Sequence, residues 1–109
     1  MKTLKFTPEL CEQILKRIKT STWRLFDDKD IQTNDELAFV NKATGEIIGL
    51  ASEERVKIKT LGTLGEGDWS GHERYVSEDE MLQTYKQYYG DNVSLETEVK
   101  IIDFTFQPT

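Results

Sequence analysis

The chain opens with an alternation of apolar and polar residues that changes within a few positions to a helical spacing. Leu4 and Phe6 alternate with polar neighbours, which predicts a short half-buried strand. Thr7 suits a helix N-cap and Pro8 a first helical position. We therefore expect a helix from Pro8 to about Ile18, whose apolar stripe packs on a sheet. That stripe consists of Leu10, Cys11, Ile14, Leu15 and Ile18.

The middle of the chain has the pattern of polar turns and hairpin strands. Residues 19–24 are rich in Thr and Ser, which favour strands and turns over helix interiors. The elements expected next are turns at 27–30 and 33–35, a strand over 37–40, a hairpin turn over 41–45, and a return strand from 47 to 51 that resumes at Val56 after a polar interruption at 52–55.

A glycine-rich loop and a second helix follow. Residues 61–74 contain four glycines and predict a loop with at most a short helical turn near Leu61. Ser77 and Glu80 form a capping-box pattern, with Val76 and Met81 as a hydrophobic staple. The last elements expected are a helix with a buried stripe of Met81, Leu82, Tyr85, Tyr88 and Tyr89, a stop at Gly90, and a strand over 99–106.

This order of elements predicts an α+β domain with a strongly curved, mostly antiparallel sheet, or a small β-barrel, flanked by two main helices. At 109 residues the chain is expected to form a single domain spanning 1–109. One cysteine, Cys11, and one histidine, His72, supply neither a disulfide nor a zinc ligand set, so we expect no metal and no cofactor. No signal peptide or membrane span is evident, which makes the cytoplasm the expected location.

The net charge of −6 is unevenly distributed. Residues 1–60 contain 11 Lys or Arg against 10 Asp or Glu, whereas residues 61–109 contain 3 against 10. Tight nonspecific binding to polyphosphate draws on many cationic contacts, so this balance argues against it. A local basic patch remains compatible with the sequence.

The segment Lys19-Thr20-Ser21-Thr22-Trp23-Arg24, followed by Asn34-Asp35 before a strand, resembles the ASCH domains of the PUA-like superfamily. Their motif reads Gly-x-Lys-Thr-x-Thr-x-Arg and is followed by a Gly-Asp turn. The resemblance extends to the later Gly- and Glu-rich loop and to the helix ending at Gly90. Arg17 and Asn34 stand where this motif has Gly. Asn tolerates positive φ well, whereas Arg17 is expected to reshape the mouth of the site.

The resemblance implies a PUA-like fold and a ligand that is a nucleoside or RNA. One bacterial branch hydrolyses the acetyl amide of N(4)-acetylcytidine with a Lys, a Thr and a Glu. By position these roles fall on Lys19, Thr22 and Glu73, with Glu66 as the competing carboxylate. The residues expected to bind the ligand are Thr20, Trp23, Arg24, Glu66 and Trp69, with Tyr75 as a further aromatic wall.

Hydrolysis by Lys19, Thr22 and Glu73 requires a particular backbone geometry and particular pKa shifts. In an extended strand Lys19 and Thr22 would face opposite sides, so they converge only if Lys19 lies in the bend between helix and strand. A Lys acts as a base once neutral, which requires a pKa lowered from about 10.4 to about 7 or 8 by burial and a like-charged neighbour such as Arg24. Glu73 as proton donor requires a raised pKa and a dry pocket.

Two other function classes compete with hydrolysis. A noncatalytic RNA-binding module would use Lys19 and Arg24 with further cations to hold phosphates. The further cations available are Lys16, Arg17, Lys57 and Lys59. A regulatory domain that binds a protein partner is the third class. The acidic second half of the chain favours a small ligand, which ranks hydrolysis first.

Overall fold

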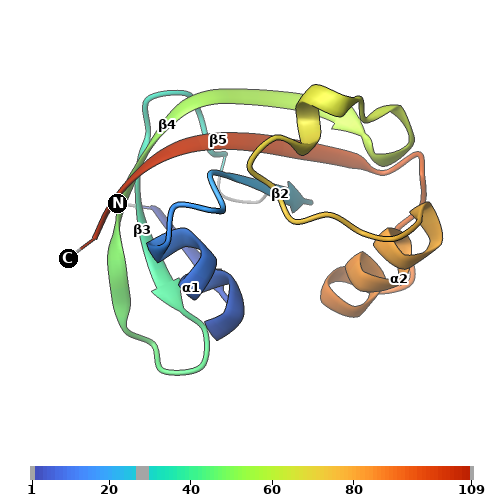
Figure 1. Cartoon of the computed structure of the whole chain (residues 1–109). Helices are drawn as coiled ribbons and strands as arrows, with labels where there is room; N and C mark the ends of the chain where they lie inside the picture. Colours follow the sequence, from blue (N-terminus) through green and yellow to red (C-terminus); the bar gives the residue numbers. More distant parts are fainter. Residues whose placement is uncertain (1, 27–29, 109) are drawn as a thin grey trace.

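The computed structural model describes residues 2–26 and 30–108 and consists of a curled sheet with two helices (Figure 1). The predicted turn at 27–30 lies mostly outside the described residues. None of the described helices is long and apolar enough to cross a membrane. The elements in order are β1 Lys2–Phe6, α1 Pro8–Leu15, β2 Ser21–Leu25, β3 Glu36–Asn41, β4 Ile47–Thr60, the 3-10 turns η1 Leu61–Thr63 and η2 Glu66–Trp69, α2 Glu78–Tyr89, and β5 Glu98–Pro108.

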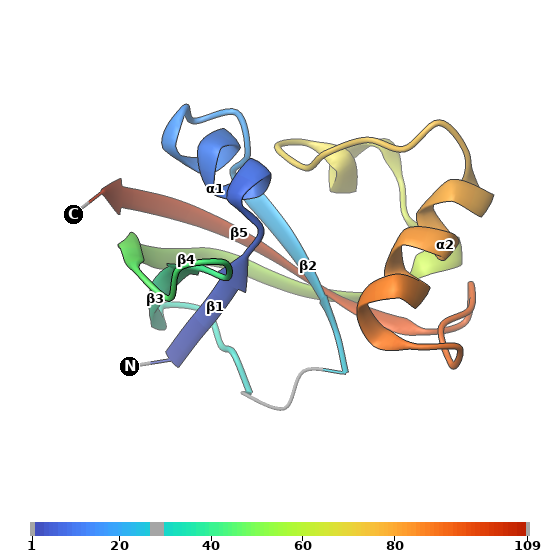
Figure 2. The same ribbon diagram turned by 90° about the horizontal axis from the view of Figure 1, so that it is seen from below.

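The sheet has the strand order β1-β3-β4-β5-β2 and curls into a half-barrel, which confirms the predicted α+β class. All neighbouring strands pair antiparallel except β1 and β3, which are parallel. Both helices lie on the same side of the long β4 and β5 ribbons, and β2 runs between the helices when the molecule is seen from below (Figures 1 and 2). The expected final strand is an inner strand, flanked by β4 and β2.

Two apolar clusters divide the core. The cluster around α1 contains Cys11 and Ile14 together with phenylalanines of β1, β3 and β5. The cluster around α2 contains Met81 and Tyr85 together with Trp23 of β2. Each helix buries its own cluster, and the region between the helices, over β2, contains both polar and aromatic side chains.

Helix α1 ends at Leu15, three residues earlier than the spacing predicts. Thr7 caps its start by accepting a hydrogen bond from the Leu10 amide at 3.4 Å. The chain then reverses direction, because the amides of Ile18 and Lys19 both donate to the Gln13 carbonyl, at 2.9 and 3.2 Å. Leu15 and Ile18, which were expected on the buried stripe, are 48% and 65% exposed. This early reversal places Lys19 in the bend that precedes β2.

Arg17 and Asn34, the two departures from the ASCH motif, both have left-handed backbone, with φ of 66° and 73°. Glycine adopts this conformation without strain, which explains its presence at these motif positions. The Arg17 guanidinium donates to the Phe106 carbonyl and lies 5.6 Å from the centre of the Phe106 ring. The side chain therefore turns toward the end of β5.

Strand β4 is continuous, so the predicted interruption at 52–55 is wrong. Pairing with β5 continues through this polar stretch and only shifts register between Glu53 and Arg55. Ser52 and Glu54 face solvent while Glu53 is buried. A bulge in a long strand accommodates one extra residue while the ladder continues on both sides, and apolar alternation does not reveal it.

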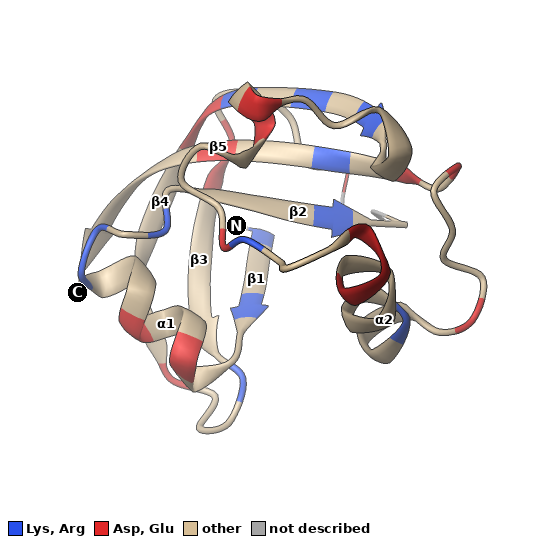
Figure 3. Ribbon diagram, turned by 45° about the vertical axis from the view of Figure 1, so that its right-hand side comes forward, with Lys and Arg blue, Asp and Glu red and all other residues tan. Residues whose placement is uncertain are grey.

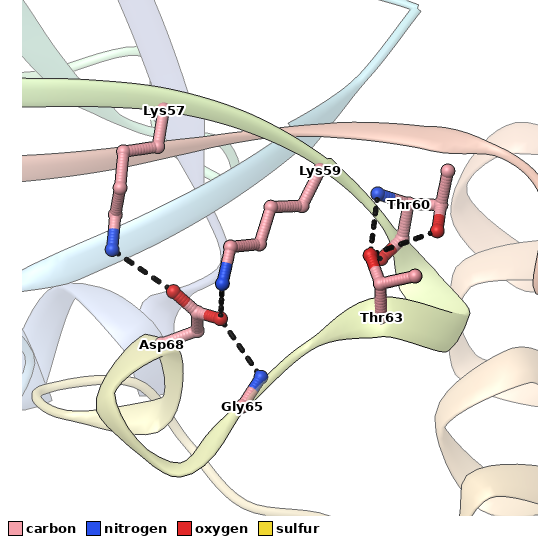
Figure 4. A network of polar contacts seen from close by, with 6 residues as sticks. All are labelled: Lys57, Lys59, Thr60, Thr63, Gly65 and Asp68. Atoms are coloured by element: carbon pink, nitrogen blue, oxygen red, sulfur yellow. Dashed lines mark hydrogen bonds and ion pairs between the residues drawn. The ribbon is translucent and has the colours of Figure 1, made fainter.

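The glycine-rich loop is fixed to β4 by one carboxylate (Figure 4). Asp68 of η2 accepts hydrogen bonds from Lys57 at 2.9 Å, Lys59 at 2.6 Å and the Gly65 amide at 2.8 Å. Burial raises the pKa of Asp68, but these donors more than offset burial, so its pKa lies well below the usual range. The loop that leads to Glu73 is therefore anchored on the long strand.

Helix α2 begins after Ser77, as predicted, because the Ser77 hydroxyl accepts a hydrogen bond from the Glu80 amide at 3.1 Å. Val76 is 90% exposed, so the predicted hydrophobic staple with Met81 does not form. Gly90, with φ of 99°, caps the end of the helix.

The left-handed backbone at residue 17 predicts an unusual order of stability between two variants. Arg17→Ala and Arg17→Gly both lose the guanidinium contacts, but only glycine relieves the backbone strain. We expect Arg17→Gly to exceed Arg17→Ala by about 1 kcal/mol in unfolding free energy, measured by urea denaturation. Lys16, with φ of −83°, is the matched control, where alanine is expected to be the more stable by about 0.5–1 kcal/mol. The same order at both positions would contradict the argument.

Candidate functional site

A cavity of about 290 Å³ lies between the two helices, over β2. Its walls come from the end of β1, the start of α1, the bend before β2, β2 itself, the loop before α2 and the end of α2. The lining residues are Lys5, Phe6, Thr7, Leu10, Lys19, Thr22, Trp23, Arg24, Lys42, His72, Glu73, Tyr85, Tyr88 and Tyr89.

An ion pair between Lys19 and Glu73 lies in this cavity. The Lys19 Nζ atom is 2.5 Å from Glu73 Oε1, although the two residues are 54 positions apart in the chain. The Lys19 side chain is 1% exposed and the Glu73 side chain 24%. The amine is therefore closed off from solvent, whereas the carboxylate faces the open part of the cavity.

Gly71 holds the two segments that carry this pair. Its carbonyl accepts hydrogen bonds from the amides of Thr20 and Ser21, at 2.8 and 3.1 Å. Its φ of 74° is left-handed, and a Cβ at this position would overlap the Thr20 hydroxyl. Only glycine fits here without a shift of the backbone. The loop thus approaches the bend closely enough for Glu73 to reach Lys19.

His72 closes the cavity behind Glu73. Its Nδ1 atom is 2.7 Å from the Glu73 carbonyl oxygen and 3.2 Å from Glu73 Oε1, and its Nε2 atom is 3.4 Å from the Tyr85 hydroxyl. The ring stacks on Trp23 with centroids 3.9 Å apart. Burial and the charge of Lys19 lower the pKa of His72 to about 4. The imidazole is therefore neutral at pH 7.

The charges of the ion pair are held in a dry environment. Burial lowers the pKa of Lys19, and the charge of Arg24 adds to this, while Glu73 opposes both; the resulting pKa is below the ordinary value. Burial raises the pKa of Glu73, but Lys19 and His72 more than offset burial, and its pKa is also lowered. The pKa of the Lys19 amine is thus lowered, as a general base requires. The pKa of the Glu73 carboxyl group is also lowered, whereas a proton donor requires a raised pKa.

The geometric condition for joining Lys19 and Thr22 is met, because Lys19 precedes β2 and both side chains line the cavity. Thr22 is buried, and no described residue forms a hydrogen bond with its hydroxyl. The backbone around it is fixed by pairing of β2 with β5, where Thr22 lies opposite Ile102. This hydroxyl is therefore available to a ligand.

The other predicted ligand residues divide into two groups. Trp23 and Arg24 line the cavity. Thr20, Glu66 and Trp69 do not: Thr20 packs against Gly71, and the Glu66 side chain is 93% exposed beside Arg74, at 3.7 Å. Trp69 packs edge-on against Trp23, with ring centroids 4.6 Å apart. Glu73 is thus the carboxylate that meets Lys19, while Trp69 supports Trp23 from outside the cavity, as does Tyr75 through its contact with Trp69.

Sequence reasoning missed the aromatic wall and two cations of the cavity. Tyr85, Tyr88 and Tyr89 are expected on a buried helix stripe. Tyr85 is buried as predicted and Tyr88 is 52% exposed, but all three also line the cavity. Lys5 and Lys42 also line it. The polar hydroxyl of tyrosine in a supposed core stripe is the signal that could have indicated this wall. In the described part of the chain, no group of His, Cys, Asp and Glu side chains could hold a metal ion.

The neutral state of His72 predicts a pH-dependent stability. Between about pH 6.5 and pH 4 the unfolded chain gains a proton on this ring that the folded protein does not, so the unfolding free energy falls as the pH falls through this window. We expect the unfolding free energy to fall by about 3 kcal/mol across this window because of His72. The variant His72→Asn is expected to lack this contribution to the pH dependence. Urea denaturation at pH 7, 6, 5 and 4 of wild type and His72→Asn measures the difference. Equal pH slopes would refute the assignment.

No family model and no curated protein matches this sequence. Several solved structures are similar to it in fold, among them the following three. An ASCH protein of Zymomonas mobilis is 22% identical with a TM-score of 0.66, covering 97% of this chain and 68% of that chain. The ASCH domain of Lactobacillus crispatus is 12% identical with a TM-score of 0.65, covering 88% and 69%. An Enterococcus faecalis protein of the DUF984 family is 12% identical with a TM-score of 0.75, covering 92% and 71%.

These likenesses agree with the motif at Lys19 to Arg24 and with the curled sheet between two helices. At these identities they show the fold. The resemblance seen in the sequence is confirmed at this level: the chain has the fold of the ASCH domain proteins.

Proposed function

We propose that this protein hydrolyses the amide bond between an acyl group and the exocyclic amine of a modified cytidine. The observation that carries the proposal is the 2.5 Å contact between Lys19 and Glu73 inside a cavity that Thr22 also lines. The motif resemblance supplies the reaction class, and the fold of the ASCH neighbours supports it. The cavity volume of about 290 Å³ lies at the small end of ligand sites, which suits one nucleoside.

The lowered pKa of Glu73 does not exclude it as a proton donor, because the pair shares one proton. At 2.5 Å the proton of the Lys19 ammonium can pass to Glu73, which leaves a neutral amine and a protonated carboxyl group. A bound ligand that displaces water from the cavity disfavours two separated charges and so favours this neutral form. One transfer thereby produces both the base and the acid that the reaction requires.

In the proposed reaction the Lys19 amine removes the proton of the Thr22 hydroxyl, whose oxygen attacks the acyl carbon. The tetrahedral intermediate collapses as Glu73 gives its proton to the exocyclic nitrogen, so that the C–N bond breaks and cytidine leaves. Water then hydrolyses the acyl ester on Thr22 and releases the carboxylic acid. One water is consumed, and the three side chains return to their starting state.

The competing RNA-binding function is less well supported, because its further candidate cations already contact other groups of the protein. Lys57 and Lys59 both pair with Asp68, Lys16 pairs with Glu12 at 2.9 Å, and the Arg17 guanidinium donates to a backbone carbonyl. Cations that already have partners contribute little to a phosphate-binding surface. The cavity, by comparison, contains the segment that the motif singles out.

Hydrolysis of N(4)-acetylcytidine, followed as release of cytidine by chromatography, tests the proposal. We expect Lys19→Ala, Glu73→Gln and Thr22→Val each to lower kcat/KM by about 10²–10⁴, because each removes a group that moves a proton or forms the ester. Thr22→Ser retains a hydroxyl and is expected to retain measurable turnover.

Glu66→Gln is the matched control for Glu73→Gln, since it removes the same charge from the same loop outside the cavity. It is expected to have wild-type activity. Circular dichroism of each variant separates loss of chemistry from loss of the fold. Full activity in Lys19→Ala, or no turnover by the wild type of any acylated cytidine, would reject the function.

A further inference from the structure

The cavity gathers positive charge in a protein whose net charge is −6. Four cationic side chains line it against a single carboxylate, that of Glu73. The cations are Lys5, Lys19, Arg24 and Lys42. In Figure 3 basic segments of β1 and β2 lie between the acidic segments of α1 and of α2. Such a local excess within an acidic protein attracts an anionic ligand to this one place.

Three of these cations are held by backbone contacts where β1 and β2, the two edge strands of the curled sheet, approach each other. The Lys42 amide donates to the Phe6 carbonyl at 2.8 Å, which fixes Lys42 beside the end of β1. The Arg24 Nη2 atom donates to the Lys5 carbonyl at 3.1 Å, and its guanidinium lies 4.7 Å from the centre of the Phe6 ring. Arg24 thus joins β2 to β1, while Lys5 lies on β1 and Lys42 lies in the turn after β3.

The ammonium groups of Lys5 and Lys42 differ from most other lysines in the protein. Neither has a hydrogen bond or an ion pair with any residue that the structure describes. By contrast, Lys2 pairs with Asp35 at 2.8 Å, and both Lys57 and Lys59 pair with Asp68. Two exposed cations that contact no charged or hydrogen-bonding partner among the described residues, and that line the cavity, are available for a ligand.

We propose that the cavity binds its cytidine ligand as a nucleoside monophosphate, with the phosphate held by Lys5 and Lys42. The identity of the base rests on the proposed function; the anionic group rests on the four cations of the cavity. A phosphate carries close to two negative charges at neutral pH, and lysines bind it as mobile point charges. The volume of about 290 Å³ suits a single nucleotide and not several nucleotides of a strand.

The test is calorimetric titration of the wild-type protein with cytidine and with cytidine 5′- and 3′-monophosphate. We expect at least one monophosphate to bind about ten-fold or more tightly than cytidine, the ratio that one charge-assisted hydrogen bond supplies. The variant Lys5→Gln/Lys42→Gln is expected to remove this preference while its affinity for cytidine is unchanged. High salt is expected to weaken binding of the monophosphate and to leave binding of cytidine unchanged.

The double variant Lys16→Gln/Arg55→Gln is the matched control, because it removes the same total charge from residues that do not line the cavity. It is expected to keep the preference for the monophosphate. Equal affinity of wild type for cytidine and both monophosphates overturns the proposal, as does a preference that survives in Lys5→Gln/Lys42→Gln. Tighter binding of a short RNA than of either monophosphate, lost in the same variant, assigns the lysines to a nucleic-acid strand and also overturns it.

Failure of the proposed hydrolysis gives a different result from failure of this inference. One outcome is a preference for the monophosphate that depends on Lys5 and Lys42, without turnover of any acylated cytidine or cytidylate. This outcome supports the phosphate site and rejects the hydrolase function. Turnover of N(4)-acetylcytidine with no preference for a monophosphate supports the hydrolase and removes the phosphate site.

Discussion

The Gly71 carbonyl accepts two hydrogen bonds, from the amides of Thr20 and Ser21, and these determine how the site is assembled. They join the loop before α2 to the bend before β2, two segments separated by half the chain. Without this contact the buried Lys19 amine would lack its anionic partner, and burial of an unpaired charge costs several kcal/mol. The site and the fold in this region thus depend on one close approach that a side chain at residue 71 would prevent.

Two carboxylates that accept hydrogen bonds from lysine side chains, Asp68 and Glu73, have different surroundings. Asp68 receives three donors, including two lysines at the surface, and its role is to fix a loop. Glu73 accepts a hydrogen bond from one enclosed amine and faces a cavity. Buried ion pairs such as that of Lys19 and Glu73 give little net stability, because the cost of desolvation cancels much of the attraction. That balance agrees with the chemical role that we propose for the Lys19–Glu73 pair.

Much of the fold follows from the sequence because local signals and tertiary contacts agree. The caps at Thr7 and Ser77 and the stop at Gly90 bound the helices close to where the pattern puts them. The errors arise where distant contacts decide. Ile18 continues a helical spacing, yet the chain has already reversed at Arg17, and β4 continues through polar residues because β5 pairs with them.

For the site, local spacing identifies the segment from Lys19 to Arg24 but not its partners. The sequence assigns the carboxylate to Glu73 only by loop placement, with Glu66 as the competing residue, and the folded loop places Glu73 on Lys19 and Glu66 at the surface. The tyrosines of α2 have only their hydroxyl groups as a local signal, and Lys5 and Lys42 have none. They line the cavity because β1, β3 and α2 converge on β2, which is a property of topology.

The backbone at residues 17 and 34 also bears on how relatives of this fold are recognised. The bend at residue 17 and the turn at residue 34 require a left-handed backbone conformation. Glycine adopts this conformation most readily, but it is not the only residue that can adopt it. Arg and Asn occupy the same conformation here at a modest energetic cost. A signature written in glycines would pass over chains of this kind, whereas a comparison of backbone shape would find them.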